Sequence, residues 1–165
     1  MGHGTAARER VLKLSAHFSR PEMVTTQSGI ENEPTLDAWI NMTRLCCDVL
    51  EPLRATVGAL RVNSGYRSPA VNQAIGGANK SAHTYGRAAD VGPLARGVSA
   101  LDIMAALDGI PFDKAIFEYR GRSPWVHIQV RDVTRAPRGV LLMSLKAGSF
   151  EKFNPQDPRL EEFRT

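Results

Sequence analysis

The residues best suited to chemistry in this sequence are an imidazole and a carboxylate in one short segment, His83 and Asp90. Each offers one ligand atom to a divalent metal, and Gly86 between them lets the chain fold back so that both side chains reach one point. A third ligand must come from elsewhere. His127 is the natural candidate, because it lies in residues 125–130, a run with strand character.

Two histidines and one carboxylate with an open fourth position form the ligand set expected of a catalytic zinc. The structural alternative makes His83 a loop histidine, Asp90 a turn or capping residue and His127 a half-buried strand residue. On composition and spacing alone this alternative is favoured, because isolated His and Asp residues are more often structural than metal-bound.

The composition is that of an ordinary globular protein. The chain has 165 residues, with 42% hydrophobic and 23% charged residues, which suits a single domain with a real core. Its formal charge of +4 favours an anionic partner such as nucleic acid, an acidic membrane surface or a cell-wall polymer. A nucleic-acid binder is disfavoured by the lack of a Lys/Arg stripe interleaved with aromatics. No apolar run approaches the roughly 20 residues of a membrane span.

The elements that must position these residues can be placed by periodicity and capping signals. Helices are predicted over residues 5–16, 35–58, 69–75 and 98–107. A short helical turn is predicted to begin at residue 19. Strands are predicted over residues 60–64, 88–91, 112–119, 125–130 and 139–145. We expect an α+β fold, with helices packed on one side of a small, mostly antiparallel sheet, all within one domain of residues 1–165. The tail from about residue 148 is expected to pack loosely or to remain partly mobile.

The two cysteines lie within one predicted helix, and Arg67 lies just after a predicted strand. The only cysteines, Cys46 and Cys47, are adjacent in the helical pattern of residues 35–58 and cannot readily bridge, so they are interpreted as packing residues. Arg67 follows the strand 60–64 in a turn, where its guanidinium can pair with a carboxylate or remain a solvated surface group, and the turn taken alone favours the solvated group.

Several motifs in a fixed order resemble peptidase family M15, the zinc D-Ala-D-Ala carboxypeptidases and endopeptidases, particularly its small phage-type members. Hedgehog signalling domains share that fold. The likeness runs from about residue 18 to residue 130. The motifs that carry it are Ser64-Gly65-Tyr66-Arg67-Ser68-Pro69, Asn72, Gly76-Gly77, Ser81-x-His83-x-x-Gly86-x-Ala88-x-Asp90 and Trp125-Val126-His127.

The resemblance implies that His83, Asp90 and His127 hold one zinc ion. It also implies that Arg67 steadies a substrate carbonyl or carboxylate and that Ser81 contacts the substrate near the metal. Two aromatic residues of the same motifs are expected to help bind the substrate, namely Tyr66 and Trp125.

The sequence departs from the family at the general base. Many members place an acidic residue three positions before the last histidine, and that position is Pro124 here, which has no acid/base group. We expect Glu118 to replace it, because a hairpin of strands 112–119 and 125–130 brings Glu118 near His127. Glu118 can also be a surface residue at the strand end, and Asp113 is a less favoured base.

The resemblance thus predicts a zinc peptidase that cuts peptidoglycan stem peptides, as a carboxypeptidase or an endopeptidase, in a phage lysis or virion protein. The alternative is a catalytically silent zinc module that binds wall peptide or a protein partner. A monomer is expected. Residues 1–10 lack an apolar signal-peptide core, so we expect synthesis in the cytoplasm and delivery to the wall by lysis, phage or another export route.

Overall fold

A six-stranded mixed sheet organises the fold in the computed structural model, which describes residues 12–164. The strand order is β1-β2-β4-β3-β5-β6. All neighbouring strands are antiparallel except β3 and β5, which are parallel, so the predicted mostly antiparallel α+β fold is confirmed. The strands are β1 (Leu60–Ser64), β2 (Ala88–Pro93), β3 (Lys114–Glu118), β4 (Trp125–Gln129), β5 (Val140–Ser144) and β6 (Glu151–Lys152).

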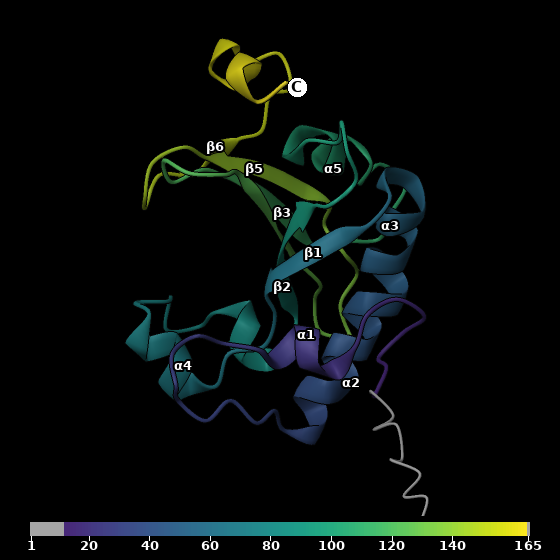
Figure 1. Cartoon of the computed structure of the whole chain (residues 1–165), viewed down its shortest axis with the longest axis vertical. Coiled ribbons are helices and arrows are strands. Elements are labelled where there is room, and N and C mark those ends of the chain that lie inside the picture. Colours follow the sequence, from purple (N-terminus) through teal and green to yellow (C-terminus); the bar gives the residue numbers. More distant parts are fainter. Residues whose placement is uncertain (1–11, 165) are drawn as a thin grey trace, which may run out of the picture.

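Helices cover one face of this sheet. Figure 1 shows α5 and α3 to the right of the strands, α2 below α3, and α4 at the lower left. The bounds are α1 (Arg20–Val24), α2 (Leu36–Leu45), η1 (Cys46–Leu50), α3 (Glu51–Val57), α4 (Pro69–Ala74), η2 (Ala82–Tyr85), α5 (Ala100–Ala105) and η3 (Pro158–Phe163). Met42, Leu53 and Ile103 from the helices join Val126 and Ile128 from β4 in one apolar core. Burial of this apolar surface stabilises the sheet on its helix-covered side.

The predicted long helix over residues 35–58 is present as three consecutive segments. Thr35 caps α2, since its side chain accepts a hydrogen bond from the Ala38 N–H, and Gly58 ends α3 with a positive φ of 83°. Between them η1 is a π-helical turn, a one-residue insertion in the helical repeat that turns the following residues to a new face. Both Leu45 before it and Leu53 after it are buried.

Capping chemistry also fixes two shorter helices. In α1 the Glu22 carboxylate accepts hydrogen bonds from the backbone and side chain of Ser19, and in α5 Asp102 does the same for Ser99. Both residues at the N-cap positions were recognisable in the sequence. The strands predicted over 60–64, 88–91, 112–119, 125–130 and 139–145 are all present.

The first predicted helix requires a correction. Residues 5–11 lie outside the described part of the chain, and residues 12–16 are not helical. Lys13 instead forms an isolated antiparallel bridge with Ser19. The cause is a distant carboxylate, because Glu51 accepts hydrogen bonds from the Ser15 hydroxyl at 2.6 Å and from the His17 N–H at 2.7 Å. These contacts hold the segment in a bent path along α3.

The C-terminal tail packs on the sheet. Leu160 is fully buried, and the Phe163 ring lies 5.3 Å from that of Phe117 and 4.8 Å from that of Tyr119 between ring centroids. Figure 1 shows this segment beyond β5 and β6, at the far end of the molecule from α2. Phe163 therefore contributes to the core, whereas Phe150 from the same tail is exposed and lies in the region of the histidines.

Candidate metal centre

Three ligand residues from three elements meet at one point. His83 comes from η2, Asp90 from β2 and His127 from β4. The pairing of β2 with β4 places Asp90 directly opposite His127, and η2 leads into β2, which brings His83 above the same strand. One ligand atom from each residue lies within 4.8 Å of the other two.

The separations of these atoms fit a tetrahedral zinc. His83 Nε2 lies 3.2 Å from His127 Nδ1 and 3.3 Å from Asp90 Oδ1, and His127 Nδ1 lies 2.9 Å from Asp90 Oδ1. Ligands at zinc bond lengths of about 2.0–2.1 Å occupy tetrahedron corners about 3.3 Å apart. Two nitrogens and one oxygen also match zinc chemistry and leave a fourth corner open. The residues present therefore fit the ion.

The ring orientation of His83 is fixed by a backbone contact. Its Nδ1 lies 2.6 Å from the Gly65 carbonyl oxygen, which can only accept, so Nδ1 carries the proton and donates it. Nε2 is then left with its lone pair directed at the other ligands. His83 is 2% exposed, so its ring is held in this tautomer away from bulk water.

His127 is oriented by a polar chain that reaches well away from the site. Its Nε2 lies 3.4 Å from Gln129 Oε1, and Gln129 Nε2 donates to Asp113 Oδ2 at 2.9 Å. Asp113 is 1% exposed and accepts two hydrogen bonds from Arg138, at 2.8 and 2.7 Å. Because Asp113 fixes which end of the Gln129 amide faces His127, Nε2 is the protonated nitrogen and Nδ1 is free to bind metal.

The sequence did not reveal this chain of hydrogen bonds. Its presence removes Asp113 as a candidate general base. Burial opposes ionisation of Asp113, but hydrogen bonds from Arg138 and Gln129 outweigh it and lower the pKa of the carboxyl. Asp113 is thus ionised and fully engaged, and it does not line the cavity that contains the ligands. The alternation of His127 and Gln129 along one strand was the only available signal.

Asp90 is held in place by the guanidinium of Arg67. Its Oδ2 accepts a hydrogen bond from Arg67 Nη2 at 2.6 Å, while Arg67 Nε donates to Ser64 Oγ at 2.8 Å. Burial raises the pKa of Asp90, but the charge and hydrogen bonds of His83 and His127 outweigh it and hold that pKa well below its usual range. Arg67 is therefore paired with a carboxylate of the protein rather than solvated at the surface, and this pairing leaves Oδ1 for the metal position.

The local backbone around His83 depends on Gly86. This residue caps η2 in the left-handed region with φ of 67°, and a Cβ atom there would collide with the Ala38 carbonyl. Gly65 approaches Met23 equally closely, so a side chain would not fit there either. The two glycines let the turns that carry Arg67 and His83 lie against the helices.

Glu118 lies on the same side of the sheet as the ligands. In the β3–β4 pairing Ile116 faces His127 and Glu118 faces Trp125, so Glu118 is one pleat away from the metal ligand. Burial and the nearby charge of Asp90 raise the pKa of Glu118. Arg120 Nη2 donates to its carboxylate at 3.0 Å and keeps the side chain directed along the strand end.

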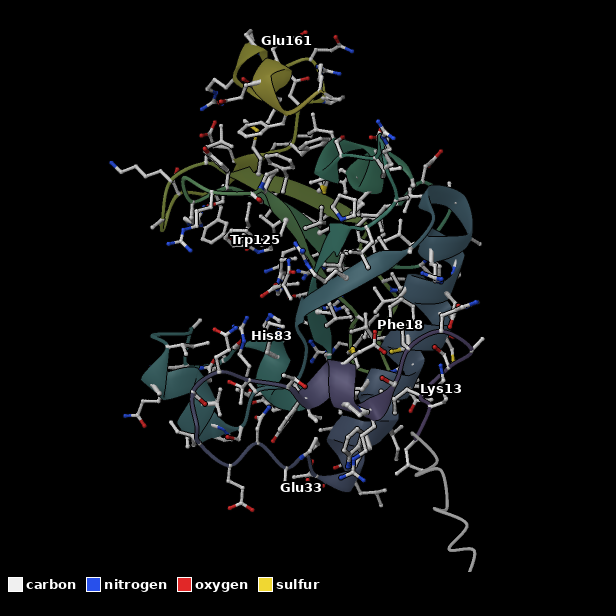
Figure 2. All side chains as sticks on the ribbon, viewed as in Figure 1. Lys13, Phe18, Glu33, His83, Trp125 and Glu161 are labelled. Carbon is white, nitrogen blue, oxygen red and sulfur yellow. The ribbon has the colours of Figure 1, made fainter. Side chains whose placement is uncertain are left out.

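A cavity of about 330 Å³ opens onto these groups. Figure 2 shows His83 and Trp125 on opposite sides of it, with His83 in η2 and Trp125 at the start of β4. Ser81, Arg67 and Glu118 also line the cavity, together with all three ligands. Tyr66 does not: it is 4% exposed and belongs to the core, because its backbone is tied to Met23 and Asn32. The structure thus brings together every predicted site residue except Tyr66.

Fold and site together define an α+β protein with a three-ligand candidate metal centre in an open cavity. The family comparison identifies it further, because the model of the family described as Peptidase M15 matches residues 16–129, which include all three ligands. The chain belongs to the peptidase M15 family, as its motifs suggested. No curated protein matches the chain. Among the described residues, no helix is long and apolar enough to cross a membrane.

Proposed function

We propose that this protein is a zinc peptidase that hydrolyses peptide bonds in the stem peptides of bacterial peptidoglycan. The observation that carries the proposal is the triangle of His83, Asp90 and His127 ligand atoms in a chain of the M15 family. His83 Nε2, Asp90 Oδ1 and His127 Nδ1 would hold the ion. When bound, zinc lowers the pKa of a water molecule and polarises the scissile carbonyl.

The general base in this proposal is Glu118. Its carboxylate takes a proton from the attacking water and then returns it to the leaving amine. A raised pKa suits this double role, because the group must both accept and release the proton near neutral pH. Glu118 lies at a strand end rather than at the position occupied by Pro124. Among residues 12–164 it is the only Asp or Glu besides Asp90 that lines the cavity.

In this proposal Arg67 both holds Asp90 and binds the substrate carbonyl. Two of its nitrogens are engaged by Ser64 and Asp90, which fixes the guanidinium plane, and Nη1 remains to hold the oxygen of the scissile carbonyl as charge develops on it. Trp125 and Ser81 form two walls of the cavity and position the peptide by apolar contact and hydrogen bonding.

The test is to incubate the zinc-loaded protein with purified peptidoglycan and to identify released fragments by mass spectrometry. We expect release that a chelator abolishes and that His127→Ala lacks. Fragment masses locate the bond and so separate a carboxypeptidase from an endopeptidase. Stoichiometric zinc binding without release from several wall types would overturn the proposal in favour of a catalytically silent module that binds wall peptide.

A further inference from the structure

A second, larger cavity of about 760 Å³ adjoins the metal centre. The two cavities share three lining residues, Lys80, Ala82 and Gln129. A peptide bound at the metal can therefore continue past Lys80 and Gln129 into the second cavity without leaving the surface. The two cavities adjoin along these shared residues, and we call them together the groove.

The second cavity is strongly cationic. Five basic side chains line it, and only two acidic ones do, Asp113 and Asp132. The basic residues are Lys80, Arg87, Arg131, Arg135 and Arg138.

Ion pairs within the groove leave part of this charge free. Arg87 pairs with Asp132 at 2.6 Å, and Arg131 and Arg138 pair with the buried Asp113 at 3.3 and 2.7 Å. Neither Lys80 nor Arg135 forms an ion pair with any residue in the described part of the chain. Two cationic side chains thus remain available to a ligand in a cavity that already carries excess positive charge.

We propose that this cavity is a subsite for a free carboxylate of the substrate, remote from the scissile bond, held by Lys80 and Arg135. The inference rests on the proposed function and specifies its substrate class: stem peptides with an ionised internal carboxylate are preferred over the same peptides carrying a primary amide. An amide presents the same shape without the charge, so the groove discriminates by electrostatics rather than by size.

The experiment compares a pair of purified muropeptides that differ only at the internal carboxylates, free in one and amidated in the other. We expect wild type to have a higher kcat/KM for the free acid. The double variant Lys80→Met and Arg135→Met should lower that value about five- to tenfold, as expected for two exposed charges, and leave the value for the amide nearly unchanged. The preference of wild type should shrink as salt is raised.

A matched control removes the same charge elsewhere. Arg96 and Lys146 are exposed, form no ion pair among the described residues and line neither cavity, so Arg96→Met with Lys146→Met should leave the preference intact. Equal losses on acid and amide, or no loss in the double variant, would overturn the subsite.

A binding measurement separates this inference from the proposed function. Calorimetric titration of both muropeptides into the zinc-loaded Glu118→Gln protein measures the acid preference without turnover. Preferential binding of the acid that disappears with Lys80 and Arg135 supports the subsite even if no bond is cut. Equal affinity for both muropeptides refutes the subsite even if hydrolysis is observed.

Discussion

The two faces of the sheet differ in function although the same strands supply both. Along β4, Val126 and Ile128 point into the helix-covered core and are fully buried. Their neighbours Trp125, His127 and Gln129 alternate with them and are half-buried on the other face, where the cavity lies. A strand of five residues thus contributes its even positions to the core and its odd positions to the candidate site.

The difference shows how a rigid site is built on a small domain. The covered face immobilises the backbone of β2, β3 and β4 by apolar packing, so residues on the open face are held in register without needing a core of their own. Polar contacts then set the rings and carboxylates, as Gly65 does for His83 and Gln129 does for His127. Variants on the open face should change chemistry, and variants on the covered face should change stability.

The largest effect is expected on the open face. Glu118→Gln keeps the shape but removes the proton acceptor, so hydrolysis should fall about 10²–10⁴-fold while zinc still binds one ion per chain. Fragment release and metal stoichiometry measured on the same sample check this. Glu31→Gln, an exposed glutamate outside the cavity, is the matched control. Hydrolysis by Glu118→Gln at the wild-type rate would remove Glu118 from the mechanism.

On the covered face, Phe117→Ala should lower the free energy of unfolding by about 3–5 kcal/mol, because it removes a fully buried ring that also contacts Phe163. Urea unfolding measures the loss. Zinc binding by the fraction that remains folded should be unchanged. An unchanged unfolding midpoint would mean that the tail and β3 do not share one core.

A smaller effect is expected when the contact between Gln129 and His127 is removed. Gln129→Leu preserves bulk but cannot orient His127, so zinc affinity should fall roughly 10- to 100-fold. Competition with a chromogenic chelator measures the affinity, and melting of the metal-free protein should shift little. Gln73→Leu, on the exposed side of α4, provides the control. Equal zinc affinities for wild type and Gln129→Leu would show that the 3.4 Å contact does not orient the ring.

The smallest effect concerns the reactivity of the two cysteines in η1, one of the helical segments on the covered face. Burial raises the pKa of Cys46 to about 12, so at pH 8 its thiol stays protonated and unreactive, whereas Cys47 is exposed. Iodoacetamide should therefore modify one thiol of the folded protein, at Cys47, and both after denaturation. Peptide mapping checks the site, and early labelling of Cys46 would show that the helix opens readily.

Much of the fold was predictable because its signals are local. Ser19, Thr35 and Ser99 cap helices through neighbours within three residues, and the alternation of residues 125–130 marks a strand. The candidate site was predictable to the extent that its residues lie in ordered motifs. His83, Asp90 and His127 are brought together as the motifs implied.

What escaped prediction depends on contacts between distant parts of the chain. Residues 12–16 looked helical, but Glu51 holds them in another path, and no property of the segment itself reveals that partner. Tyr66 belongs to a site motif, yet it turns into the core. The Gln129–Asp113–Arg138 chain joins residues whose proximity follows only from the pairing of β3 with β4 and the turn before β5.

The close approach of Gly86 to the Ala38 carbonyl has a consequence for genetics. Any substitution there must adopt a left-handed backbone and push away the main chain of α2, which moves the residues that follow Ala82. In a saturation-mutagenesis screen scored by zinc binding or peptide hydrolysis, Gly86 should tolerate as few replacements as His83, Asp90 and His127. A reader of such a map would count it among the catalytic residues, although its only contribution is the absence of a side chain.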